Sequence, residues 1–184
     1  MDRELPHPPR PPRLPALADV PDGVPELNIF RTLAHHPKLL DRFSRFGGFL
    51  LYRGQLPDRE RELVILRTGF RSGSVYEYGQ HTVMGTAAGL TAEEIGRLTR
   101  EGTDGWAPTD RDLVTFVDEL CAVNTVSDAT WARLAGRWTE AELLELLVVA
   151  GFYRLVSGLL NSVGVELEPG TPGWPDPAAA PATP

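Results

Sequence analysis

The stretch from Glu62 to His81, ELVILRTGFRSGSVYEYGQH, holds the residues whose types and spacing are best suited to chemistry. If residues 74–88 form a helix, Glu77 and His81 stand four positions apart and share one face. Ser74, three positions before Glu77, lies on the same face. A carboxylate raises the pKa of a neighbouring imidazole, and burial raises the pKa of the carboxylate. The pattern therefore indicates general acid–base catalysis near neutral pH.

A second carboxylate precedes this helix. Glu62 opens an apolar helical run, and a turn bounded by Gly69 and Gly73 separates that run from the next helix. A short turn makes the two helices antiparallel neighbours, so we expect Glu62 to approach His81. Spacing alone leaves a plainer interpretation open, in which the Glu77–His81 pair is a boundary contact and Glu62 is a first-turn helix charge. Tyr76 and Tyr78 are equally compatible with packing and with substrate contact.

Helical periodicity, proline positions and capping signals predict the elements that position these side chains. Pro37, Pro57 and Pro108 each stand where a helix can begin. Capping boxes start at Thr91 and at Thr139. The expected helices cover 26–35, 37–52, 57–70, 74–88, a segment from 91, a segment from 109, a segment from 127, and 139–163. No segment alternates with period two, so the predicted fold class is all-α with about seven or eight helices.

Prolines concentrate at both ends of the chain. Residues 1–25 hold eight of the seventeen prolines and residues 169–184 hold six. Proline lacks the backbone donor and fixes φ, so we expect extended, weakly ordered arms at 1–25 and 169–184 around one helical domain at 26–168.

Bulk properties exclude several classes of function. A net charge of −7 without a basic stripe argues against nucleic-acid binding. The single cysteine, Cys121, excludes an internal disulfide, and its apolar helical setting predicts a small core residue. No apolar stretch of about 18 residues and no signal-peptide pattern are present, so we expect a cytoplasmic protein with no membrane partner. Metal-ligand and nucleotide-binding spacings are also missing, and no cofactor is predicted.

Three segments carry a resemblance to a known family: RERELVILRTGF, VYEYGQH and AAGLTAEEI. Together they resemble the carboxymuconolactone decarboxylase family, which includes the alkylhydroperoxidase D (AhpD)-like proteins. NIFRTLAHHPKLL and GFYRLVSGLLNSVGVELEPG extend the likeness over residues 26–168. The resemblance implies a compact, AhpD-like multi-helix bundle.

The chain departs from the peroxidase-like branch of that family at the redox pair. That branch has a Glu, a Cys-x-x-Cys pair, and a His four positions after the second Cys. Here Glu62 and His81 match, but Ser74 and Glu77 occupy the cysteine positions. Peroxide reduction needs a thiolate, so thiol peroxidase activity is not expected.

The remaining resemblance is to the non-redox branch and implies a cofactor-free lyase that decarboxylates a small lactone or carbonyl carboxylate. In this interpretation His81 donates a proton to the dienolate, Glu77 orients His81 or shares its proton, and Glu62 acts as a relay. The expected substrate-binding residues are Ser74, Arg67, Tyr76 and Tyr78. Arg45, Arg53 and Arg154 are alternatives to Arg67 for holding the substrate carboxylate.

Other functions stay open at this point. An isomerase or a dehydratase would use the same Glu–His pair, and a non-catalytic, ligand-binding or structural member would keep only the fold. The resemblance also implies a homo-oligomer, a trimer or hexamer, with the site near a subunit interface. The apolar character of 139–163 on more than one side agrees with that expectation.

Overall fold

The computed structural model describes residues 10–20 and 22–175, and within them it contains eight helices and no strand. The all-α prediction is confirmed. The helices are α1 (Asn28–Leu33), α2 (Pro37–Tyr52), α3 (Asp58–Arg71), α4 (Val75–Ala87), α5 (Ala92–Arg97), α6 (Pro108–Val123), α7 (Asp128–Ala135) and α8 (Glu140–Val163).

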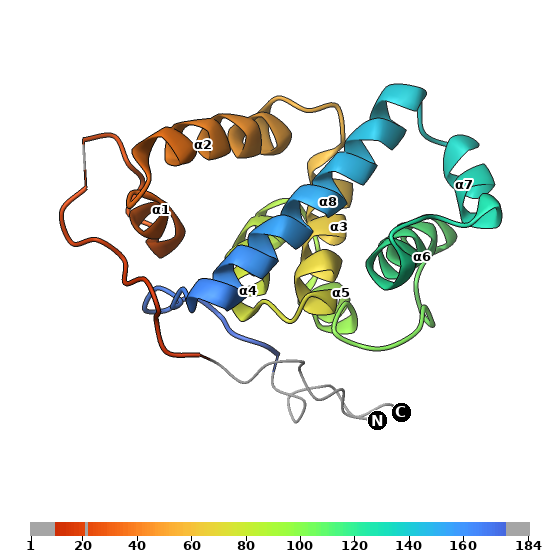
Figure 1. Cartoon of the computed structure of the whole chain (residues 1–184). Coiled ribbons are helices and arrows are strands. Elements are labelled where there is room, and N and C mark those ends of the chain that lie inside the picture. The colour runs from red at the N-terminus through yellow and green to blue at the C-terminus, as the bar shows by residue number, and fades with distance from the viewer. Residues whose placement is uncertain (1–9, 21, 176–184) are drawn as a thin grey trace.

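Helix α3 is the central element. Every residue from Arg61 to Phe70 is buried, and α4, α6 and α8 pack around it. Figure 1 shows α8 crossing the molecule diagonally, with α3 and α4 behind it and α2 at the upper left. A helix that is buried on all sides reads as a continuous apolar run, as Leu63–Leu66 does.

The predicted helix starts are confirmed. Pro37 and Pro108 occupy first-turn positions of α2 and α6, where a missing N–H costs nothing. Thr91 and Thr139 form complete capping boxes with Glu94 and Glu142. The first helix, α1, is shorter than the predicted 26–35.

The central helix ends within the predicted interval from Gly69 to Gly73, but not at Gly69 itself. Helix α3 continues to Arg71, and the chain turns at Gly73, whose φ of 65° suits glycine. Gly69 instead lets α4 approach closely: a Cβ on Gly69 would lie 3.4 Å from the backbone nitrogen of Tyr78. Small residues at a helix contact shorten the distance between helix axes, which brings the polar residues of α3 and α4 together.

The described parts of the two terminal segments lie against the helices. The backbone N–H of Arg13 donates to Val163 O at 2.7 Å, and the Arg31 guanidinium donates to Leu17 O at 2.7 Å. At the other end, the Trp174 ring packs on Phe70 and Tyr78. Of the predicted arms at 1–25 and 169–184, residues 1–9, 21 and 176–184 lie outside the described residues.

Helix α8 combines a buried face with an exposed apolar one. It is long and apolar enough to cross a membrane by length and composition, although half of its most apolar window is buried inside the fold, as in a core helix. Leu144, Val148 and Leu155 are exposed by 63%, 41% and 59%. The prediction that residues 139–163 are apolar on more than one side is confirmed.

Candidate active site

The site is built on a contact between α3 and α4. Glu62 lies in the second turn of α3 and is completely buried. Its Oε2 is 2.6 Å from Nδ1 of His81, on α4. The antiparallel arrangement expected from the short turn between the helices therefore brings the carboxylate to the imidazole.

The second ring nitrogen of His81 meets the second carboxylate. Nε2 lies 3.0 Å from Oε1 of Glu77, one helical turn earlier on α4. Both carboxylates and the imidazole are at least 95% buried. A carboxylate only accepts hydrogen bonds, so a ring held between two carboxylates donates from both nitrogens and is an imidazolium.

The electrostatics favour that charged form. Burial lowers the pKa of His81, but the charge of Glu62, its hydrogen bond and the interactions with Glu77 outweigh burial and raise the pKa to about 9. Arg61 adds a second positive charge, with Nε and Nη2 each 3.3 Å from Oε1 of Glu62. Two carboxylates, one imidazolium and one guanidinium make a cluster without net charge, which limits the cost of burying it.

Sequence reasoning missed Tyr153. This residue of α8 places its ring edge-on to the imidazole of His81, with centroids 4.9 Å apart and planes at 85°. Burial, then the charges of Glu77 and Glu62, raise the pKa of Tyr153 well above its ordinary value, so its hydroxyl stays protonated. A buried tyrosine hydroxyl needs a polar neighbour, but nothing in the sequence around Tyr153 indicates that His81 is close to it.

Ser74 has a local role next to the site. Its Oγ accepts from the backbone N–H of Glu77 at 3.4 Å, which caps the N-terminus of α4. The cap fixes the first turn of α4, the turn that carries Glu77. The structure thus places Ser74 as a support for Glu77.

The structure does not bring Tyr76 and Tyr78 to His81. The Tyr76 hydroxyl accepts from Ile29 N at 3.2 Å and donates to Glu168 at 2.7 Å. The Tyr78 hydroxyl donates to Ile95 O at 2.7 Å. Both rings anchor neighbouring segments, and these contacts correspond to the packing interpretation.

Arg67 is likewise separated from His81 by its contacts. Its guanidinium is completely buried and binds both oxygens of Asp118, at 2.7 and 2.6 Å, together with two backbone carbonyls. Four donated hydrogen bonds leave little capacity for a substrate carboxylate. The contacts correspond to a structural role that ties α3 to α6.

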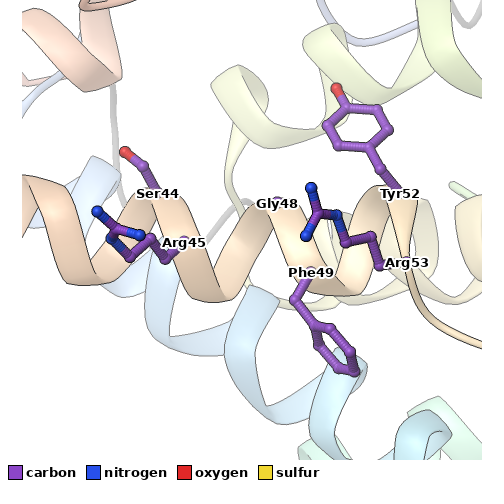
Figure 2. Close-up of a pocket in the computed structure, with 6 residues that line it drawn as sticks. All are labelled: Ser44, Arg45, Gly48, Phe49, Tyr52 and Arg53. Atoms are coloured by element: carbon purple, nitrogen blue, oxygen red, sulfur yellow. The ribbon is translucent and has the colours of Figure 1, made fainter.

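The alternative arginines line two surface cavities. Arg45 and Arg53 border a cavity of about 490 Å³ along α2, together with Ser44, Gly48, Phe49 and Tyr52. Figure 2 shows the two arginines extending from the same side of α2, with Tyr52 beside Arg53. Arg154 lines a different cavity, beside Cys121.

Arg53 is the better placed of the two α2 arginines to receive an anion. Arg45 is already paired with Asp41 at 2.7 Å. Within 10–20 and 22–175, no hydrogen bond or ion pair engages the Arg53 guanidinium. In the same part of the chain, no group of three or more His, Cys, Asp and Glu side chains is arranged to hold a metal ion.

Comparison with known proteins identifies the fold and supports a family. Residues 37–116 match the carboxymuconolactone decarboxylase family model. No protein of curated function matches the sequence.

Three solved structures are similar in fold. The AhpD core of an uncharacterized peroxidase-related protein from Ralstonia eutropha JMP134 is 20% identical, with a TM-score of 0.74, and the match covers 89% of this chain and 94% of that one. A peroxidase-related protein from Silicibacter sp. TM1040 is 15% identical, with a TM-score of 0.74 and coverage of 88% and 96%. The debrominase Bmp8, solved as a variant with 2,3,4-tribromopyrrole, is 12% identical, with a TM-score of 0.65 and coverage of 78% of each chain.

The matched segment contains the whole of α3 and α4, and so the pair Glu62 and His81. Together with the likeness in fold, this match supports a carboxymuconolactone decarboxylase/AhpD-like family for this chain.

Proposed function

We propose that this protein is a cofactor-free acid–base lyase that decarboxylates a small lactone or carbonyl carboxylate. The observation that carries the proposal is the buried Glu62–His81–Glu77 arrangement, in which one imidazole contacts a carboxylate at each nitrogen. In decarboxylation the C–CO₂ bond breaks, its electron pair enters a dienolate conjugated with the carbonyl, and a proton must reach carbon. An imidazolium with a pKa of about 9 holds that proton at neutral pH.

We propose different roles for the two carboxylates. Glu62 is completely buried and contacts both Arg61 and His81, so in this proposal it orients the ring. Glu77 contacts Nε2 and therefore stands between that proton and any acceptor. Proton delivery requires Glu77 either to relay the proton or to move aside.

The cavity along α2 supports the substrate class. Arg53 offers a planar set of donors to a carboxylate, and Tyr52 and Phe49 offer apolar rings to a small unsaturated ring. A carboxylate substrate also explains why a chain with a net charge of −7 would present two arginines at one cavity. The same groups would serve an isomerase or a dehydratase, since each also transfers a proton beside a carbonyl.

Thiol peroxidase chemistry has little support. Ser74 and Glu77 stand where a thiol pair would be needed. Burial raises the pKa of Cys121, and the charges of Arg154 and Arg71 offset only part of that rise. The single thiol therefore stays protonated and weakly nucleophilic.

A non-catalytic, small-ligand-binding role is the second candidate. The observation that favours it is the near-complete burial of Glu62, Glu77 and His81, which makes their contact suitable for stabilising α3 against α4. The two candidates differ in what they require of His81. A lyase needs its proton to leave, whereas a structural pair needs it to stay.

The deciding experiment measures CO₂ release from candidate lactone and β-carbonyl carboxylates in D₂O. A lyase incorporates one deuterium at the carbon that loses CO₂, and H81Q lowers kcat by about 100-fold or more. E77Q shifts the pH–rate profile, because Glu77 contacts the donating nitrogen. Y76F is the matched control, since Tyr76 is on the same helix but bonded to Glu168. Turnover that survives H81Q would contradict the proton-donor role.

We further propose that the chain acts as a homo-oligomer, a trimer or hexamer, in the cytoplasm. Support comes from the exposed stripe on α8, Leu144, Val148, Gly151, Leu155 and Gly158, which repeats at intervals of four and three. That spacing is the seam of a helix packed against another helix. An exposed seam in water favours a partner surface.

A further inference from the structure

A second cavity lies at the opposite end of α3 from Glu62. It measures about 320 Å³ and is lined by Arg71, Ser72, Cys121, Arg154, Gly158, Asn161 and Ser162. Arg71 follows Glu62 by nine positions, which corresponds to about 13 Å along a helix axis. This cavity is therefore a separate place from the surroundings of His81.

Positive charge exceeds negative charge at this cavity. Asp118 is shared, because both its oxygens bind Arg67 while Arg71 Nε lies 3.4 Å from Oδ1. Arg71 also pairs with Glu101 at 2.9 Å. Three guanidinium groups, including Arg154, thus face two carboxylates.

Arg154 provides the positive charge that exceeds the negative charge at this cavity. Its Nη1 donates to Leu120 O at 3.2 Å and to Asn124 Oδ1 at 2.6 Å, so neutral oxygens hold the guanidinium in place. Among the described residues, no carboxylate pairs with it, and Nε and Nη2 make no hydrogen bond. The side chain is thus fixed at one nitrogen and has donors to spare at the others.

Neutral polar groups complete the lining. The Asn161 amide donates to Ser72 O at 2.9 Å, which joins the end of α3 to α8 and holds the two walls together. Ser72 and Ser162 add hydroxyl groups on opposite walls. A fixed guanidinium beside hydroxyl donors is the arrangement that recognises an oxyanion.

We propose that this cavity binds a small oxyanion, a carboxylate or a phosphate, with Arg154 as its principal charged contact. The argument is independent of the proposed lyase function, because none of the groups involved touches Glu62, Glu77 or His81. One bound negative charge would balance the surplus positive charge, in a chain whose net charge of −7 otherwise repels anions.

Cys121 provides a direct reporter, because it is the only cysteine and lines the cavity. The experiment follows alkylation of the full chain by neutral iodoacetamide, using mass spectrometry, while inorganic phosphate or succinate replaces chloride at constant ionic strength. Saturable slowing by phosphate alone assigns a phosphoryl ligand, and slowing by succinate alone assigns a carboxylate. Calorimetric titration with the same anions should give the same midpoint concentration as the alkylation assay.

The variants separate a specific site from general charge effects. R154Q should weaken binding by about tenfold or more, because a charged hydrogen-bond donor is lost, and R154K should retain part of it. R42Q is the matched control, since Arg42 is an exposed arginine on α2, 3.6 Å from Asp41, and should leave binding unchanged. The proposal is overturned if neither phosphate nor succinate slows the alkylation of Cys121. It is also overturned if the anion slows that alkylation as much in the R154Q variant as in the parent chain. It is also overturned if protection follows protein concentration instead of the anion, because a second copy would then cover the cavity.

Discussion

Oε2 of Glu62 lies 2.6 Å from Nδ1 of His81, across two helices that are joined by only three residues. The close turn and the glycine contact at Gly69 make this distance possible. The contact has a consequence for proton binding. Because the folded state raises the pKa of His81, protonation of His81 and folding are linked.

Stability should fall as the pH rises through about 9. The pKa of His81 is about 9 in the folded chain, against about 6.5 for an unperturbed histidine. Its contribution of about 3 kcal/mol is fully present below pH 6.5 and is lost as the pH rises through 9. Urea unfolding between pH 6 and 10 measures the slope, and ¹⁵N NMR of the ring nitrogens gives the pKa directly. E62Q should lower that pKa and flatten the slope, whereas a ring that is neutral at pH 8 in the parent chain would contradict the assignment.

Substitution of Arg67 should affect stability and leave the site intact. R67Q removes the guanidinium that binds both oxygens of Asp118 and leaves that carboxylate without its main partner. The expected loss is about 3 kcal/mol in the free energy of unfolding. The exposed R42Q should cost less than about 1 kcal/mol. An R67Q protein with normal stability and a raised KM would instead restore the substrate-binding role that the sequence suggested.

Charge on the α8 stripe should disrupt self-association. L155E places a carboxylate on a residue that is 59% exposed, so the isolated fold should tolerate it, whereas an apolar interface should not. Sedimentation velocity at micromolar concentration should show an oligomer for the parent chain and a 20.2 kDa species for the variant. V123E is the control, because Val123 is an exposed apolar residue at the end of α6. A parent chain that sediments as a monomer would rule out the proposed assembly.

A side chain at Gly79 should displace the C-terminal segment. A Cβ there would overlap the carbonyl oxygen of Pro172 and press on Leu167 and Thr171. G79A should therefore cost about 1–3 kcal/mol and increase hydrogen exchange in residues 165–175. G96A serves as the control, because no atom lies within 4 Å of a Cβ at that helical position, and alanine there should be neutral or stabilising. Equal exchange in both variants would show that the segment has another anchor.

Local signals predicted most of the helices. The capping boxes at Thr91 and Thr139 and the prolines at positions 37 and 108 mark helix starts through local backbone chemistry, and all four are found in place. Gly69 was expected to begin the break after the central helix but lies inside that helix. Glycine occurs both where a helix ends and where two helices pack closely, so the residue alone did not distinguish the two cases. Only the packing of α4 on α3 shows that Gly69 is at a helix–helix contact and not at a helix end.

The site was predictable where it depended on neighbouring helices. Glu62, Glu77 and His81 follow from helical spacing and one short turn. Tyr153 arrives from α8, more than seventy positions further along the chain, and no local pattern indicates that approach. The partners of Tyr76 and Arg67 are similarly remote, Glu168 and Asp118, so sequence alone could not tell anchoring from substrate contact.

The hydrogen bonds of the Glu168 carboxylate determine where this chain can be truncated without loss of its fold. It receives hydrogen bonds from the backbone of Asn28, from Tyr76 and from Gln80, so one side chain near the C-terminus holds α1 to α4. The matched segment 37–116 contains Tyr76 and Gln80 but contains neither Glu168, nor α8, nor α1. Expressed by itself, that segment would expose the side of α3 that α8 covers. It would also lose the Tyr153 ring that packs against His81. Boundaries for expressing the folded part of this chain should therefore include both Asn28 and Glu168.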